Sequence, residues 1–329
     1  MLPSGRRIGV HLPLGAGMVR AADRAVEIGA TTIQVFTDNP TSWRRRPTLP
    51  DGLPAFRARL AEADIAPIAI HAPYLVNLAG PEAVFHEQSV AVLANELRVS
   101  RAYGASLVNV HIGSHRGEGT DAGLARLTTG IAAVLERADD GDAGPDDIAI
   151  VLENGSGGGF GMGTTIEELG EIDRSVRAAG VPHARFRFCL DAAHLWGAGY
   201  PIDTAAGVDE VVGEFDEEIG LDRLAMVHLN DSRSERGSRA DRHEHVGAGR
   251  IGAEGLGRLL AHPGLAHVAY ILETPGMDED YDAINLVRAR ALAEGRPLDE
   301  LPAAAFDLRS ARGRSAPPDP DGTPDRQAR

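Results

Sequence analysis

Residues 224–245, LAMVHLNDSRSERGSRADRHEH, join a short apolar run to a loop dense in ionisable side chains. The apolar part predicts a buried strand. The loop mixes imidazoles and carboxylates at short spacing, and these are the donor types that a borderline-soft divalent metal prefers. The arginines between them are suited to binding phosphate. The stretch indicates a strand that ends in a metal- or phosphate-binding loop, and the alternative is a solvated polar loop. The loop residues concerned are His228, Asp231, Arg233, Arg236, Arg239, Asp241, Arg242, His243 and His245.

Similar apolar runs recur along the chain, separated by segments rich in Ala, Leu, Glu and Arg. Near-continuous apolar runs are typical of strands buried on both faces, as in parallel sheets. Their alternation with helical segments predicts a (β/α)8 TIM barrel, with a doubly wound open sheet as the alternative. The predicted strands are Ile8–Leu12, Thr32–Phe36, Pro67–Ile70, Ser106–Val110, Ile148–Leu152, Phe186–Leu190, Leu224–Val227 and Ala269–Leu272. The predicted helices include Met18–Ile28, Gly52–Ala63, Pro81–Tyr103, Ala122–Ala138, Thr165–Ala179, Ala206–Ile219 and Ala253–Leu260.

Composition sets the limits of this interpretation. The chain has 329 residues, 43% of them hydrophobic, so a single large domain over residues 1–305 is expected. Residues 306–329 are rich in Pro, Asp and Gly, and we expect a disordered tail there. With one cysteine, Cys189, the chain has no internal disulfide, which fits either a protein of the reducing cytoplasm or one without any redox demand. No apolar stretch of membrane-spanning length is evident. The net charge of −15 argues against nucleic-acid binding unless a metal-lined site offsets it.

Ionisable residues stand at the ends of the predicted strands, where the active sites of such barrels lie. One of them alone would be an ordinary hydrogen-bonded residue. Each of the last six predicted strands ends in or near one, however, and buried ionisable groups are costly unless paired or bound to metal. A metal site explains the convergence best. Asp191 and His194 either share one ion or serve two neighbouring ions. The candidates at or just beyond the strand ends are His11, His71, His111, His115, Glu153, Asp191, His194, His228 and Glu273.

Seven sequence segments together indicate a specific protein family. In order and spacing they resemble motifs of the endonuclease IV family of abasic-site repair nucleases, and the resemblance extends roughly from Ile8 to Glu273. It implies a (β/α)8 barrel that binds three zinc ions, with Mn²⁺ or Fe²⁺ as possible substitutes. The segments are HAPYLVNLAGPE (71–82), NVHIGSH (109–115), VLEN (151–154), CLDAAHLWGAGY (189–200), HLND (228–231), DRHEHVGAGRIG (241–252) and ILET (271–274).

The resemblance also implies a ligand set, and every family position carries the expected residue type. His71, His111 and a bridging Glu153 would hold the first ion. Glu153, Asp191, His228 and Glu273 would hold the second, and His194, Asp241 and His243 the third. His11, His115 and His245 fall outside this set, and the last two are expected near the ligands or at the surface.

The implied activity is hydrolysis of the phosphodiester 5′ to an abasic site in double-stranded DNA, leaving a 3′ hydroxyl and a 5′ deoxyribose phosphate. Glu153 is the expected catalytic residue, and a monomer is expected. Tyr74 and Leu75 match family residues that push into the duplex, and the alternative for such a pair is ordinary loop packing. Thr41 occupies a place where some members carry an inserting arginine.

Four arginines are expected to contact DNA phosphates: Arg44, Arg45 and Arg46, which follow Thr41 closely, and Arg242 in the loop after His228. A solvated basic turn is the alternative for the first three.

Two other classes of function are compatible with parts of the pattern. A sugar isomerase or epimerase of the xylose-isomerase-like barrels would use one or two ions, without the element Asp241–His243 that together with His194 supplies a third. A damage sensor without turnover would have no need of a complete ligand set.

Overall fold

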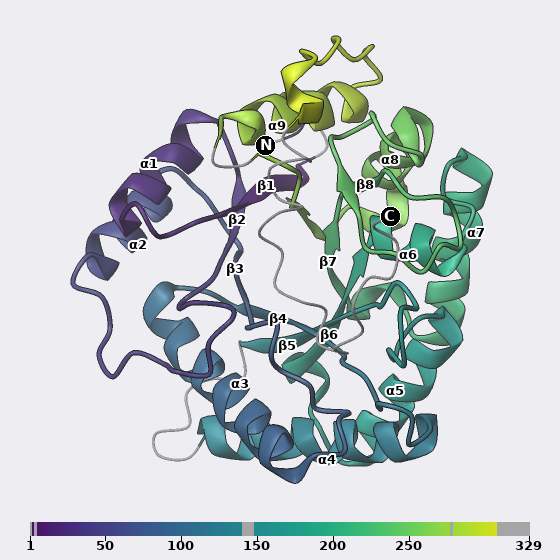
Figure 1. Ribbon diagram of the computed structural model, residues 1–329. Coiled ribbons are helices and arrows are strands. Elements are labelled where there is room, and N and C mark those ends of the chain that lie inside the picture. The colour runs from purple at the N-terminus through teal and green to yellow at the C-terminus, as the bar shows by residue number, and fades with distance from the viewer. Residues whose placement is uncertain (1, 3–4, 140–147, 277–278, 308–329) are drawn as a thin grey trace, which may run out of the picture. The chain divides into compact units, whose positions relative to one another are not determined.

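Eight parallel strands close into a barrel in the computed structural model, which describes residues 2, 5–139, 148–276 and 279–307. Their order around the barrel is β1-β10-β7-β6-β5-β4-β3-β2, and helices surround them (Figure 1). The predicted TIM barrel is therefore confirmed, and every predicted strand is present to within one residue at each end. The strands are β1 (Arg7–Leu12), β2 (Thr32–Val35), β3 (Ile68–His71), β4 (Leu107–His111), β5 (Ala149–Glu153), β6 (Phe186–Asp191), β7 (Leu224–His228) and β10 (Ala269–Leu272).

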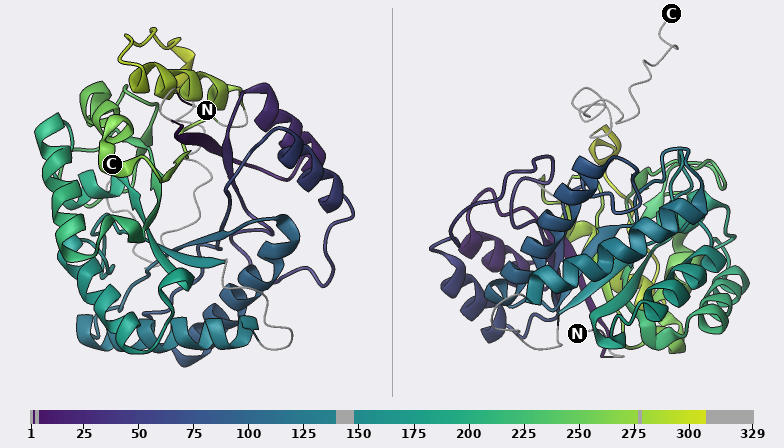
Figure 2. Two further views of the ribbon diagram at one scale, coloured as in Figure 1. Left: turned by 180° about the vertical axis from the view of Figure 1, so that it is seen from behind. Right: turned by 90° about the horizontal axis from the view of Figure 1, so that it is seen from below.

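A helix follows each strand and packs on the outside of the barrel, as the reverse view also shows (Figure 2). The seven predicted helices agree with the structure to within two residues, and α9 at the end of the barrel adds to them. The outer helices are α1 (Met18–Glu27), α2 (Leu53–Glu62), α3 (Ala83–Tyr103), α4 (Thr120–Asp139), α5 (Ile166–Ala178), α7 (Ala205–Glu218), α8 (Gly252–Ala261) and α9 (Tyr281–Ala293).

The short elements outside the predicted set include one helix and two strands next to the ionisable residues. The seven-residue helix α6 (Ala192–Ala198) starts directly at the end of β6, and Asp191 caps it by accepting the backbone N–H of His194 at 2.8 Å. The strands β8 (Asp231–Ser232) and β9 (His243–Glu244) form an antiparallel hairpin within the loop after β7. Elements this short show no periodicity in the sequence.

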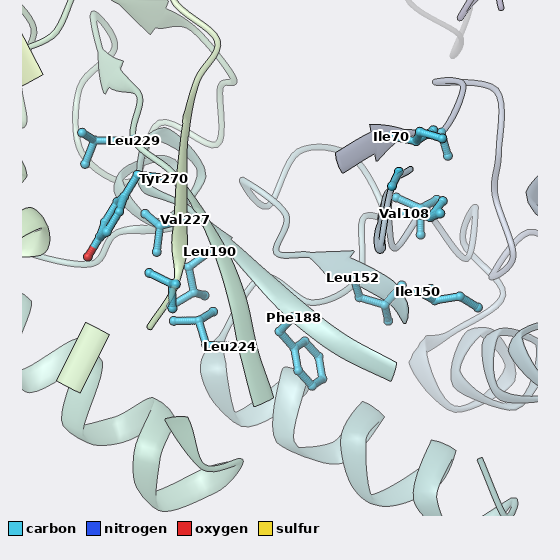
Figure 3. Close-up of a cluster of buried hydrophobic side chains, with 14 of the residues drawn as sticks. Ile70, Val108, Ile150, Leu152, Phe188, Leu190, Leu224, Val227, Leu229 and Tyr270 are labelled. Atoms are coloured by element: carbon cyan, nitrogen blue, oxygen red, sulfur yellow. The ribbon is translucent and has the colours of Figure 1, made fainter. Parts of the chain in front are cut away.

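The apolar core has two layers. The larger layer fills the space between strands and helices, and Figure 3 shows part of it, with Ile150, Phe188 and Tyr270 among the labelled side chains. A smaller layer of mostly small or unbranched side chains fills the inside of the barrel. Cys189 lies within a predicted strand, belongs to this inner layer and is completely buried, so it acts as a small hydrophobic residue. The barrel interior is therefore packed below the strand ends.

Contacts within the chain divide it into two units, Met1–Leu298 and Asp299–Arg329. The first unit contains the barrel and ends before residue 305, where the sequence predicts the domain boundary. That boundary stays a prediction, and the tail predicted to be disordered lies outside the described residues from 308 onward. Among the helices that the structure describes, none has the length and apolar content needed to cross a membrane.

Candidate metal centre

Strand register brings the predicted ligands together at the carboxyl ends of the barrel strands. In the ladder between β4 and β5, His111 pairs with Glu153. In the ladder between β6 and β7, Asp191 pairs with His228. Paired positions of neighbouring parallel strands have adjacent side chains, so four candidates are already grouped by backbone pairing alone.

Within the described chain the potential ligand atoms form three groups, and within each group they lie within 4.8 Å of one another. Glu153 belongs to the first two groups, which fits the predicted bridging role. Asp191 belongs to the second and third groups, so it shares the third group with His194. The groups are His71, His111 and Glu153; Glu153, Asp191, His228 and Glu273; and Asp191, His194 and His243.

Asp241 lies beside the third group. Its two carboxylate oxygens are 3.3 Å from Nε2 of His194 and 3.0 Å from Nε2 of His243. All nine predicted ligands therefore meet at one end of the barrel, and Asp191 adds a carboxylate to the third group beyond the predicted set.

The imidazoles are oriented for metal binding. Nδ1 of His71 donates to the carbonyl oxygen of Ala72 at 2.6 Å, and Nδ1 of His194 donates to that of Asn154 at 2.8 Å. Nδ1 of His243 donates to the carbonyl oxygen of Glu273 at 3.0 Å. A carbonyl oxygen only accepts, so each ring keeps a proton on Nδ1, and Nε2 is the nitrogen that can bind a metal ion in place of a proton.

His228 is oriented the other way round. Its Nε2 lies 3.2 Å from the side-chain oxygen of Gln34, so Nδ1 is left for the group. Nδ1 is buried without a hydrogen-bond partner among the described residues, yet it lies 3.4 Å from Glu153, 3.3 Å from Glu273 and 3.8 Å from Asp191. A buried nitrogen facing three carboxylates without a hydrogen bond fits a cation between them.

Three amide side chains outside the predicted set fix the carboxylates. Asn109 donates to Oε2 of Glu153 at 2.5 Å, and Gln34 donates to Oε1 of Glu273 at 2.8 Å. Asn230 donates to Oδ2 of Asp191 at 2.6 Å and accepts the backbone N–H of Glu273 at 2.8 Å. Asn109 and Gln34 are amides within apolar strands, and that is the signal available in the sequence, whereas Asn230 stands among other polar residues and gives none.

Nearby histidines lower the pKa values of Glu153, Asp241 and Glu273, so these three carboxyl groups stay ionised at neutral pH. Burial raises the pKa of Glu153, but the charges of His228 and His111 hold it well below its usual range. Burial lowers the pKa of His194, but Asp191 and Asp241 outweigh this effect and hold it well above its usual range. A similar balance, in which Asp241 is the main opponent of burial, raises the pKa of His243 to about 10. The centre therefore attracts positive charge strongly, whether protons or metal ions.

Two ionisable residues of the opening stretch have other roles. Asp231 is buried and accepts the backbone N–H groups of Gly249 at 2.9 Å and Ile251 at 3.0 Å. It therefore holds the loop in shape and lies outside the three groups of potential metal ligands. His245 is also buried, with Nδ1 2.9 Å from the side-chain nitrogen of Asn285. His245 lies outside the three groups, as expected from the resemblance, but it is not at the surface.

Two further histidines lie outside the groups. His115 accepts the backbone N–H of Gly119 at 3.0 Å and orders its own loop. His11 is buried, with Nδ1 3.4 Å from Glu273, so it borders the second group without being part of it.

The residues predicted to contact DNA differ in their exposure. Tyr74 is 58% exposed, with its ring 5.6 Å from that of His71, and Leu75 is half-buried. Arg44 and Arg242 are exposed. Arg45 is expected from the sequence to contact phosphate, but its side chain is only 11% exposed and its guanidinium binds Glu96 at 3.2 Å. Arg45 is thus directed into the protein, because a buried carboxylate on α3 offers a stronger partner than solvent.

The glycine-rich stretch after β5, residues 155–163, forms part of the wall of a cavity. The sequence favours backbone flexibility over phosphate binding there. Backbone hydrogen bonds from Gly155 to Gly163 at 2.9 Å and from Met162 to Gly113 at 3.0 Å fasten this loop. It lines a cavity of about 190 Å³ together with His111, Glu153, His194 and Asp241, so space for a ligand adjoins the metal-binding groups.

A closed barrel with histidines and carboxylates gathered at its strand ends defines a TIM-barrel enzyme of the metal-dependent type. A family model described as "Xylose isomerase-like TIM barrel" matches residues 22–295. A protein named "Probable endonuclease 4" from Methanoculleus marisnigri is 40% identical over 286 residues, which are 87% of this chain and 98% of that protein. Its namesake from Natranaerobius thermophilus is 37% identical and covers 89% of this chain and 100% of that protein. The chain belongs to the endonuclease IV family, and it is accordingly a nuclease.

Solved structures agree with this assignment. Endonuclease IV from Thermus thermophilus superposes with a TM-score of 0.75 at 36% identity, over 88% of this chain and 99% of that one. A D-tagatose 3-epimerase-like protein superposes with a TM-score of 0.62 but at 17% identity, over 93% and 99% of the two chains, and this likeness shows the fold alone. The predicted alternative of a sugar isomerase therefore has only the shared barrel in its favour.

Proposed function

We propose that this protein hydrolyses the phosphodiester 5′ to an abasic site in double-stranded DNA, leaving a 3′ hydroxyl and a 5′ deoxyribose phosphate, at a centre of three zinc ions. The observation that carries the proposal is the orientation of the imidazoles. Each of four rings uses one nitrogen on an oxygen acceptor and directs the other toward shared carboxylates. Such outer hydrogen bonds are what metal-binding histidines typically make.

The ligands of the three ions would be those implied by the resemblance, with Glu153 bridging two ions. Bound zinc lowers the pKa of water and acts as a Lewis acid toward phosphoryl oxygens. Four carboxylates neutralise only part of the charge of three divalent ions, so the loaded centre attracts a phosphodiester although the whole chain carries −15. Manganese and iron would suit the same mixed donor set.

The chain's own residues would position the DNA. Tyr74 is exposed beside the first group, where an aromatic side chain can stack on an unpaired base or fill the gap at an abasic site. Arg44 and Arg242 are exposed and would contact phosphates. Asn109, Gln34 and Asn230 would hold the carboxylates in place during each turnover. We further propose that the enzyme acts as a monomer in the cytoplasm, with residues 1–305 as its single domain.

A duplex carrying one tetrahydrofuran abasic analogue tests the proposal. The analogue cannot undergo β-elimination, so a nick must come from hydrolysis. We expect zinc-loaded protein to nick on the 5′ side, and a DNA polymerase to extend the new 3′ hydroxyl directly. The opposite outcome is protein that holds three metal ions and leaves the duplex intact, but converts a ketose to its epimer. That outcome would refute the nuclease proposal and support the isomerase alternative.

A further inference from the structure

The loop between β2 and α2 is fastened from inside by one arginine. It spans residues 36–52 and carries Arg44 and Trp43. Its Arg45 contacts the carbonyl oxygen of Asn39 at 3.2 Å, and also that of Ser42. One guanidinium therefore closes the tight part of the loop by binding two backbone carbonyl oxygens that precede it in the chain.

The same guanidinium is anchored on α3. Glu96 is completely buried and lies 3.2 Å from Nη1 of Arg45, while its other oxygen accepts the hydroxyl of Thr37 at 2.5 Å. Burial raises the pKa of Glu96, and the bond from Thr37 and the charge of Arg45 oppose that effect. We call these three side chains, Thr37, Arg45 and Glu96, the Arg45 clamp.

The clamp serves the loop more than the barrel. A buried ion pair contributes little net stability compared with apolar packing, but it holds groups in one arrangement. Long loops without regular structure are uncommon in compact domains and usually functional. This loop leaves β2 at its carboxyl end, the end at which the metal-binding groups lie.

The fixed loop presents a particular set of side chains. Arg44, next to the clamp, is exposed, and the Trp43 ring stacks on Phe85 of α3 at 6.3 Å. Thr41 turns back, with its hydroxyl 2.9 Å from the side chain of Asn39, so the tip of the loop extends no long cation. Whatever this loop contributes to binding depends on its shape and on its exposed arginines, Arg44 and Arg46.

We propose that Arg45 and Glu96 are positioning residues that hold the β2–α2 loop in the shape that binds the DNA backbone beside the metal centre. This inference rests on the proposed function for the identity of the ligand. Arg45 acts through the loop and not on phosphate directly. A loop ordered in advance avoids the entropy cost of ordering it on binding.

The test compares Arg45→Ala, Arg45→Lys and Glu96→Gln by fluorescence anisotropy in the otherwise wild-type, zinc-loaded protein, on a duplex already nicked on the 5′ side of the tetrahydrofuran so that no strand is cut during the measurement. We expect the Kd to rise about tenfold for Arg45→Ala, with a smaller rise for Arg45→Lys, since lysine reaches fewer acceptors. Arg59→Ala is the matched control: it removes one positive charge from an exposed pair with Asp23 on the outside of α2, and the Kd should stay unchanged.

A second readout follows the loop itself. Of the two tryptophans Trp196 is only 6% exposed, so acrylamide quenching reports mainly on Trp43. Quenching should rise in Arg45→Ala together with the Kd, while the metal content stays constant. An unchanged Kd, or a Kd that changes without any change in quenching, overturns the positioning role. Wild-type protein that binds the duplex through this loop but never nicks it would refute the proposed function and leave the positioning role standing.

Discussion

Glu153→Gln removes one charge from the centre while keeping its shape. Oε2 of Glu153 lies 3.7 Å from Nε2 of both His71 and His111, and Oε1 lies 3.4 Å from Nδ1 of His228. Glutamine fills the same buried volume and can still hydrogen-bond with Asn109, so a folding defect is not expected. What changes is the carboxylate shared by two ligand groups.

The loss can be estimated from the ligand groups. Without Glu153 the first group retains two histidines, too few to hold zinc, whereas the second retains Asp191, His228 and Glu273. We therefore expect metal content to fall from three ions to about two per chain. Nicking should slow by at least about 10³-fold, or about 4 kcal/mol of activation free energy, a loss typical of removing a major electrostatic contributor.

The assay pairs metal analysis with kinetics. Protein dialysed against excess zinc and then against buffer is analysed by mass spectrometry for metal, and nicking of the tetrahydrofuran duplex is followed at saturating protein. Glu118→Gln is the matched control, since Glu118 is exposed and paired with Arg126 at 2.9 Å, outside the ligand groups. If Glu153→Gln kept three ions and wild-type turnover, the assignment of Glu153 as a bridging ligand would be refuted.

Three further predictions concern the surroundings of the centre. Gln34→Ala should weaken zinc binding about 10- to 100-fold, because His228 and Glu273 lose their common hydrogen-bond partner, and zinc titration against a chelating dye measures this. Full affinity in the variant would contradict the role given to Gln34. Tyr74→Ala should weaken binding of the abasic duplex by about 1–3 kcal/mol while metal content stays the same, and equal affinity of both proteins would exclude the aromatic contact. Chelated protein should lose thermal stability as pH rises from about 6.5 to about 10. The reason is that the folded state binds the second proton of His243 more tightly than the unfolded state does. This proton contributes its full stabilisation at pH values below the pKa in the unfolded chain, about 6.5, and none at pH values above the pKa in the folded protein, about 10. Zinc-loaded protein should show a smaller loss over the same range, and melting curves of both forms that run parallel would disprove the link between these protons and metal.

The barrel strands were predictable because each is buried on both faces. A run such as Ile148–Leu152 is then apolar at every position, and its end is marked by the first ionisable side chain, here Glu153. The ligand candidates followed from the same rule, since the carboxyl ends of all strands meet at one edge of the barrel. That Glu153 faces both His71 and His228 required the resemblance to a family and could not come from spacing alone.

The direction of long polar side chains could not be predicted. Arg44 and Arg45 are neighbours of one type, yet one is exposed and the other binds the buried Glu96, which is 51 residues away in the sequence. Asp231 and Asp241 likewise belong to one loop, but backbone N–H groups engage the first and histidines the second. Such choices depend on tertiary partners that no local pattern reveals.

The only cysteine offers a way to watch the barrel open. Cys189 lies in the inner layer of the barrel, completely buried, between strands that carry the metal-binding residues. A thiol reagent can reach it only when neighbouring strands separate, so the rate of labelling in native buffer reports how often the barrel opens. The native thiol is thus a reporter of barrel opening that requires no introduced cysteine.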